Sequence, residues 1–267
     1  MRRRRMEILA WRELVWNLVL RNLRIRYKGS ALGFFWTMLN PVFMMGIYFV
    51  FITLLRIPID LPALLVGILC WQFFVMCLSD SVAAITGYPS LIKRTYFPKL
   101  VFPVSMVSAN LINFLLSLIV LAVFLAAYAV LSPSPVGTGA SIFYLPLVIV
   151  FQTALILGLS SLFACCNVYF RDIEHIISVG LLAWFFLTPI MYPLEMVADH
   201  PRIVPWILNL YYLNPMVPIV TLYRYVFLGT APPASAFFYL SLLLSPLILV
   251  AGTAVFLSKE PYFADEL

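Results

Sequence analysis

The chain has 267 residues, of which 64% are hydrophobic and only 10% are charged, and its mean hydropathy is +1.03. A water-soluble domain could not cover so much apolar surface, so the composition excludes a soluble protein and indicates a membrane protein. The net charge of +6 requires no nucleic acid as a partner, because anionic lipid head groups suit a basic membrane surface.

The first predicted element is an amphipathic helix over residues 7–28. Steps of three and four residues place one set of side chains on a mostly apolar face: Trp11, Val15, Leu18, Asn22 and Ile25. The same steps place a polar set on roughly the opposite face: Glu13, Asn17, Arg21, Arg24 and Lys28. Such a helix lies in the membrane interface, either as a surface anchor or as a docking surface for a cytoplasmic partner.

Six transmembrane helices are predicted from charge-free apolar runs, because a hydrocarbon core of about 30 Å needs about 20 apolar residues per helix. The longest run is divided in two by a cluster of turn formers at Ser132–Gly139. The predicted spans are about 32–55, 61–81, 103–131, 142–167, 174–193 and 235–258. The fold class is therefore an all-α polytopic membrane protein, with one transmembrane domain over residues 1–267.

Positive charge is concentrated on one side of these spans. Of the 17 lysines and arginines, all but Arg56, Arg202 and Arg224 fall in the N-terminal segment, in the loops after the second and fourth spans, or in the C-terminal tail. The positive-inside rule therefore places both termini in the cytoplasm. In the later spans, the side chains of Asn110, Asn113, Gln152 and Asn167 are uncharged and polar, and they can serve either helix–helix contact or substrate contact.

The segment 194–231 differs from an ordinary loop. It holds two apolar pieces, about 203–213 and 216–228, which are too short to cross a bilayer as helices. We expect a re-entrant hairpin on the outer side that acts as a lid, with an aromatic surface belt as the alternative. The residues predicted for this outer gate are Tyr192, Pro193, Trp206, Asn214, Pro215 and Arg224.

Several kinds of chemistry are missing from the sequence. It contains no Gly-x-x-x-x-Gly-Lys-Ser/Thr motif, so it carries no P-loop, and it has neither His-Glu-x-x-His nor Gly-x-Ser-x-Gly. The four cysteines are expected to be buried thiols, and no metal site is predicted. No span carries a charge at mid-depth, which argues against an ion-coupled transporter.

An ordered set of motifs resembles one family: the membrane subunits of ATP-binding-cassette exporters that move lipid-linked polysaccharides, namely O-antigen, capsule and teichoic-acid permeases. The O-antigen branch is the most similar. The motifs are Arg26–Trp36 (RYKGSALGFFW), Asn40–Pro41, Leu91–Pro98 (LIKRTYFP), Tyr169–Ile173 (YFRDI), Leu187–Pro193 (LTPIMYP), Asn214–Pro215 and Phe263–Asp265.

The resemblance implies a multi-pass protein of the bacterial inner membrane, in which two copies of the chain pair with two P-loop ATPase subunits. ATP and Mg would then belong to the partner, and no cofactor to this chain. It also implies a coupling loop at 85–100 that seats in the ATPase. The residues expected to couple to the ATPase are Gly87, Leu91, Lys93, Arg94, Tyr96, Phe97, Lys99, Arg171 and Asp172.

The resemblance further implies a channel lined by aromatic side chains, for which the candidates are Phe34, Phe35, Phe43, Tyr48 and Phe49. We expect Arg24, Arg26 and Lys28 to contact the diphosphate of a polyprenyl-linked glycan, since they end the interface helix at the membrane surface. The alternatives are a membrane-embedded transferase using the acidic and histidine residues of 171–175, and a passive channel or drug exporter.

Overall fold

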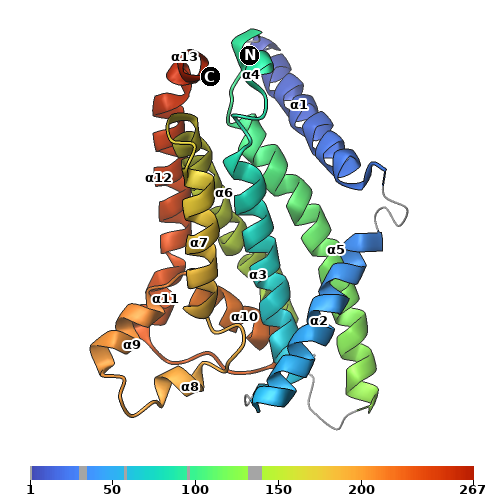
Figure 1. The fold of residues 1–267 in the computed structure, drawn as a ribbon, viewed down its shortest axis with the longest axis vertical. Coiled ribbons are helices and arrows are strands. Elements are labelled where there is room, and N and C mark those ends of the chain that lie inside the picture. The colour runs from blue at the N-terminus through green and yellow to red at the C-terminus, as the bar shows by residue number, and fades with distance from the viewer. Residues whose placement is uncertain (1, 30–34, 57–58, 95–96, 132–139) are drawn as a thin grey trace.

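The computed structural model describes residues 2–29, 35–56, 59–94, 97–131 and 140–267, and all regular structure in these residues is helical (Figure 1). The predicted turn at Ser132–Gly139 and two predicted site residues, Phe34 and Tyr96, lie outside the described residues.

Within the described residues, four helical segments are long and apolar enough to cross a membrane. The first is α3 (Leu61–Val82), and the second lies in α5 (Val101–Leu131). The third joins the short 3-10 helix Ala140–Tyr144 to α6 (Leu145–Tyr169). The fourth is the C-terminal run from α11 (Ala236–Leu242) through α12 (Leu244–Lys259) to α13 (Phe263–Glu266). The chain is therefore a polytopic, helical membrane protein.

The other two predicted spans correspond to α2 (Trp36–Leu55) and α7 (Ile173–Phe186). α7 has 14 residues, about 21 Å of helix, and ends at Phe186 rather than at residue 193. Its end is set by Pro189, which cannot donate a helical hydrogen bond and disfavours helix at the preceding Thr188. The hydroxyl of Thr188 instead donates to the Trp184 carbonyl over 2.9 Å. A count of six spans stays a prediction.

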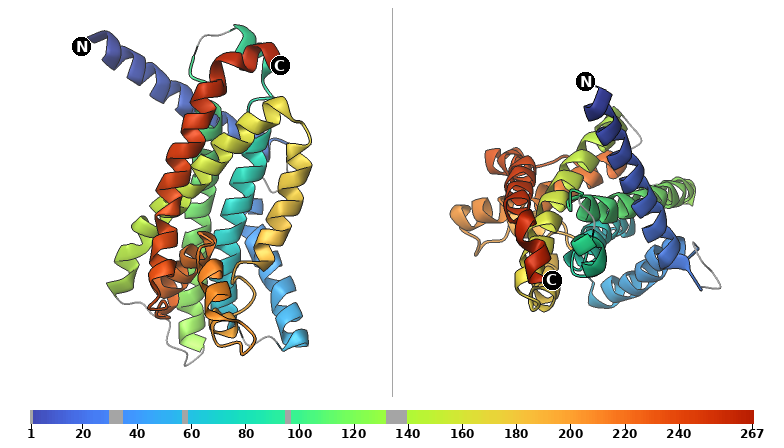
Figure 2. Two further views of the ribbon diagram at one scale, coloured as in Figure 1. Left: turned by 90° about the vertical axis from the view of Figure 1, so that its left-hand side faces the viewer. Right: turned by 90° about the horizontal axis from the view of Figure 1, so that it is seen from above.

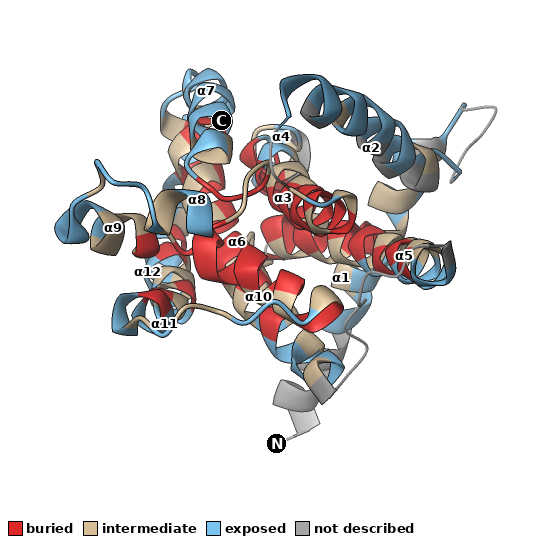
Figure 3. Cartoon of the chain, turned by 90° about the horizontal axis from the view of Figure 1, so that it is seen from below, coloured by how far each residue is buried: buried red, intermediate tan, exposed pale blue. Residues whose placement is uncertain are grey.

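The core is centred on α3, which packs against α5, α6 and α10 (Met216–Leu228). Viewed along the long axis, the buried residues gather on these helices, whereas α2 and α7 lie outside them with largely exposed surfaces (Figure 3). Polar side chains join the core helices. The Gln152 amide donates to the Cys70 carbonyl over 2.8 Å, and the Tyr223 hydroxyl donates to the Gln152 amide oxygen, also over 2.8 Å. These bonds serve helix–helix contact.

α6 and α12 pack with their backbones in close approach. A Cβ atom added at Gly252 would lie 2.1 Å from the Gly158 carbonyl oxygen, and one added at Gly158 would lie 2.4 Å from the Ile248 carbonyl oxygen. Only glycine permits two helix backbones to approach this closely.

The N-terminal helix, α1 (Arg2–Tyr27), packs along α5. It buries Leu18 and Val19 there, whereas Trp11 and Ile25, predicted on the same apolar face, are about half exposed. Its position at a membrane interface stays a prediction.

The molecule has two distinct ends. The start of α1, α4 (Pro89–Arg94) and α13 all lie at one end of the long axis, which we name the α4 end, although the start of α1 projects to one side there (Figures 1 and 2). The opposite end, named the α9 end, holds α8 (Glu195–Ala198), α9 (Pro205–Tyr212), α10 and α11 (Figure 1). α9 and α10 meet at Asn214–Pro215, where the sequence predicts two short helices; their re-entrant placement stays a prediction.

Candidate functional site

At the α4 end, one short helix is held by its apolar side and exposes its charge. Ile92 of α4 is buried, whereas the neighbouring Lys93 is exposed. The turn before α4 is closed by the Gly87 N–H, which donates to the Ala83 carbonyl over 2.9 Å. Leu91 belongs to α4 as well, but its side chain, like that of Arg94, is outside the described part of the structure.

The remaining predicted coupling residues divide into two groups. Arg171 and Asp172 are exposed on the loop between α6 and α7, at the same end as α4 (Figure 1). Phe97 and Lys99 turn into the molecule instead. The Phe97 ring centre lies 5.6 Å from that of Phe102, and Lys99 is bonded to Glu260 near the C-terminus.

The cations at the end of α1 point in different directions. Arg24 and Lys28 are exposed and line a hollow of about 380 Å³ together with Arg21. The guanidinium carbon of Arg21 lies 4.7 Å from the ring centre of Tyr88, so Arg21 also touches the segment before α4. Arg21 was not predicted as a site residue, although its spacing of three and seven residues from Arg24 and Lys28 places all of them on one helix face.

Arg26 does not share that hollow. Its guanidinium forms an ion pair with Asp80 of α3 and donates to the Asn110 amide oxygen of α5 over 2.7 Å. Asn110 in turn donates to Asp80 over 2.8 Å. Arg26 therefore joins α1 to α3 and α5. Its guanidinium bonds to other helices of the protein instead of lining the hollow.

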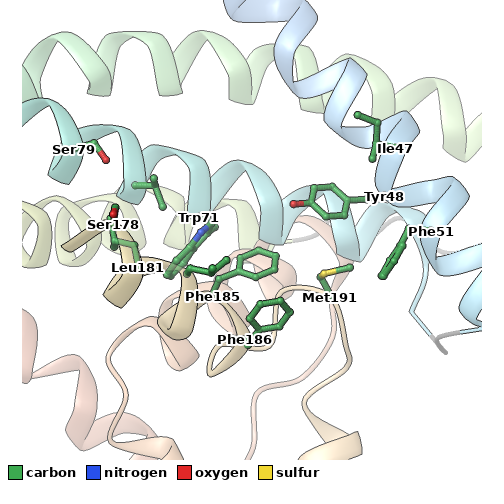
Figure 4. A pocket seen from close by; sticks show the side chains of 12 residues that line it. Ile47, Tyr48, Phe51, Trp71, Ser79, Ser178, Leu181, Phe185, Phe186 and Met191 are labelled. Atoms are coloured by element: carbon green, nitrogen blue, oxygen red, sulfur yellow. The ribbon is translucent and has the colours of Figure 1, made fainter. Parts of the chain in front are cut away.

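An aromatic groove of about 550 Å³ lies between α2, α3 and α7 (Figure 4). Trp71 and Phe185 meet in it edge to face, with ring centres 5.7 Å apart. The residues lining this groove are Ile47, Tyr48, Phe51, Trp71, Val75, Ser79, Ser178, Leu181, Leu182, Phe185, Phe186 and Met191.

Of the aromatic residues predicted for a channel, Tyr48 lines this groove. Phe35, Phe43 and Phe49 are exposed elsewhere on α2 or just before it. Trp71, Phe185 and Phe186 were not predicted, because nothing in the sequence shows that α3 and α7 approach α2.

At the α9 end, Asn214 holds the segment that follows α7. Its amide donates to the Leu187 carbonyl over 3.0 Å and to the Thr188 hydroxyl over 3.2 Å. Its oxygen accepts hydrogen bonds from the Trp184 indole over 2.8 Å and from the Met216 backbone over 3.0 Å. The turn between α9 and α10 is thus fixed to the end of α7.

Arg224 of α10 holds the same segment from inside the protein. It is buried, and its guanidinium donates to the carbonyls of Ala63 over 3.1 Å, Ile190 over 2.9 Å and Tyr192 over 3.4 Å. A Cβ atom at Gly67 would lie 3.3 Å from the guanidinium, so the glycine leaves room for it.

The other predicted gate residues are Tyr192, Pro193, Trp206 and Pro215, and they differ in their contacts and exposure. The Tyr192 hydroxyl donates to the Phe186 carbonyl over 2.9 Å and lies 3.3 Å from the Tyr211 hydroxyl. Pro215 is buried before α10, and Pro193 lines an adjoining cavity of about 320 Å³. Trp206 is 67% exposed.

The described residues contain no group of three or more His, Cys, Asp or Glu side chains that could hold a metal ion. All four cysteines are free thiols, and Cys70, Cys77 and Cys165 are buried.

Comparisons with known proteins identify the family. The family described as ABC-2 type transporter matches residues 13–228. A Myxococcus xanthus protein named O-antigen export system permease protein RfbA is 34% identical over 266 residues, covering 98% of each chain. Two Klebsiella pneumoniae proteins of the same name are 31% and 29% identical, each covering 92% of both chains. The chain therefore belongs to the ABC-2 type transporter family and is the permease subunit of an ATP-binding-cassette exporter, whose ATPase activity lies in a separate subunit.

Proposed function

We propose that this permease exports a polyprenyl-diphosphate-linked polysaccharide, and O-antigen in particular, across the bacterial inner membrane. In this proposal both termini and the α4 end face the cytoplasm, and the α9 end faces outward. The observation that carries it is the similarity over nearly the whole chain to permeases named for O-antigen export. The basic N-terminal segment supports the orientation.

The lipid diphosphate would bind at the hollow on α1. Arg24 and Lys28 are exposed there beside Arg21, and three cations on one helix face can bind several phosphate oxygens at once. Arg26 would contribute indirectly, because its bonds to Asp80 and Asn110 hold the end of α1 against the helices that cross the membrane.

The glycan would pass along the aromatic groove between α2, α3 and α7. Aromatic rings offer apolar faces to the C–H faces of sugars, so a chain can slide over Trp71, Phe185 and Phe186 without a deep binding well. A second copy of the chain would complete the channel. α7 has a stripe of apolar side chains for such a contact, each 62–68% exposed: Ile176, Val179, Leu182 and Phe186.

The ATPase would dock on the α4 end, where Lys93, Arg171 and Asp172 are exposed. The outward opening would be controlled by the segment after α7, which hydrogen bonds from Asn214 and Arg224 hold in place. Movement of this segment would exchange these bonds for bonds to water.

The test is complementation of a strain that lacks its own permease gene. We expect the wild-type chain to restore surface O-antigen, and the double variant Arg24→Ala/Lys28→Ala to lower it about tenfold or more, because two charge-assisted bonds to the diphosphate are lost. Arg12→Ala, an exposed cation on α1 outside the hollow, is the matched control and should export normally.

Normal export by the double variant at normal membrane levels would remove the phosphate site from the proposal. Restoration of a capsule or teichoic acid instead of O-antigen would assign the permease to one of those substrates.

A further inference from the structure

The C-terminal residues 260–267 fold back against α4 instead of extending from the end of α12 (Figures 1 and 2). Phe263 is fully buried, and its ring centre lies 5.2 Å from that of Phe256 in α12. It belongs to the same buried cluster as Ile92 of α4 and Phe102 at the start of α5. The C-terminal segment therefore shares an apolar core with α4.

Polar contacts join the same parts of the chain. The Lys99 backbone N–H donates to the Glu260 carboxylate, and the Lys99 ammonium donates to the Glu260 backbone carbonyl, each over 2.7 Å. The ammonium also lies 5.8 Å from the ring centre of Phe263. Bonds to charged groups are the strong ones, and these are partly buried, so the link between α4 and α5 is firmly tied to the end of α12.

The contacts of the C-terminal segment continue through α12 to α6. α12 packs closely on α6, with backbone against backbone at Gly252 and Gly158. A contiguous packed route therefore runs from α4 through the C-terminal segment and α12 to α6.

We propose that the C-terminal segment is a positioning brace for ATPase coupling. When the ATPase displaces α4, Glu260 and Phe263 carry that displacement into α12 and α6, so that both sides of the helix bundle move together rather than α5 alone. The inference rests on the proposed docking of the ATPase at α4. It assigns a role to Lys99 different from direct contact with the ATPase.

Spin labels at two exposed positions, Pro89 at the start of α4 and Leu257 in α12, test the brace in the complete permease–ATPase complex in lipid nanodiscs. Pulsed electron paramagnetic resonance then gives the distance between the labels with and without bound ATP. We expect one narrow distribution in both nucleotide states for the otherwise wild-type protein. In Glu260→Ala, the distribution should broaden and shift when ATP binds.

Two control variants separate bracing from general destabilisation. Glu260→Gln keeps an acceptor oxygen for the Lys99 N–H and should retain the narrow distribution. Glu266→Ala removes an exposed carboxylate of the same segment and should also retain it. In cells, export per ATP hydrolysed should fall about fivefold in Glu260→Ala only, the effect of about 1 kcal/mol of lost coupling.

A distribution for Glu260→Ala that matches the wild type in both nucleotide states would overturn the brace. A separate experiment tests the docking proposal. Lys93→Glu should abolish co-purification of the ATPase with the permease, and retention of the ATPase would contradict docking at α4. The label distance without nucleotide does not depend on that result.

Discussion

Arg224 is a fixed positive charge whose described hydrogen bonds go to backbone carbonyl oxygens. Arginine does not lose its proton inside proteins, so the charge must be stabilised where it lies. Its planar guanidinium reaches three carbonyls on two separate segments, the start of α3 and the segment after α7. The residue therefore ties the α9 end together and leaves the carbonyls of an irregular segment satisfied.

Replacement of Arg224 by Met should lower the stability of the protein by about 3 kcal/mol, because the carbonyls keep their burial and lose their donors. The stability of Arg224→Lys should lie between that of the wild type and that of Arg224→Met, since an ammonium cannot present a planar fork of donors. The midpoint of thermal unfolding in detergent measures both effects. The matched control is Arg202→Met at an exposed arginine of the same end. A midpoint for Arg224→Met equal to that of the wild type would show that the three bonds contribute nothing.

The cationic residues of α1 show which contacts of a side chain can be predicted from the sequence and which cannot. The cationic end of α1 is visible as a helical repeat of basic residues, and Arg24 and Lys28 do share one hollow. Arg26 is predicted with them because all three end the interface helix, but its partner Asp80 lies on another helix. Only the packing of α1 on α3 and α5 shows that pairing.

Among the helices, α6 and α12 form the contact that depends most strictly on residue size. Gly252→Ala would place a Cβ atom 2.1 Å from the Gly158 carbonyl oxygen, and backbone cannot yield there as a side chain could. We expect a loss of at least about 1–3 kcal/mol in stability, the usual cost of overpacking, measured by thermal unfolding in detergent.

Gly180→Ala in α7 is the matched control, since a Cβ atom there meets nothing within 4 Å in this chain. Alanine favours helix over glycine, so this variant should unfold at the same or a higher temperature. If Gly252→Ala were as stable as Gly180→Ala, the close approach of α6 and α12 would not be a constraint on stability.

The sequence predicts where the long helices lie better than it predicts which side of each helix is buried in the protein. Long apolar runs predict α3, α5, α6 and the C-terminal helical run, because the bilayer requires their length. The face that α1 presents to α5 could not be predicted fully: Val19 is buried, while Trp11 and Ile25 are exposed. Lipid and protein are both apolar surroundings, so periodicity does not distinguish which one a side chain faces. The aromatic groove was not predicted, because the sequence does not show that α3 and α7 approach α2.

The whole molecule is a helical bundle with a different structure at each end. At the α4 end, a short helix with an exposed lysine is fixed to the C-terminal segment, and in the proposed function the ATPase docks on this surface. At the α9 end, Asn214 and Arg224 hold the segment after α7 through hydrogen bonds, which in the proposed function are exchanged for water when the outward opening forms. Membership of the ABC-2 family makes the chain part of an ATP-driven exporter, and the side of the membrane that each end faces belongs to the proposed function.

The measurement that tests this account most directly uses vesicles containing the purified chain and its partner ATPase. A polyprenyl-diphosphate-linked O-antigen is placed in the leaflet that faces the ATPase, and an impermeant lectin detects its polysaccharide on the opposite side. We predict transfer only when both proteins are present and ATP is hydrolysed. Transfer by the chain alone, or no transfer when both proteins hydrolyse ATP, would contradict the account.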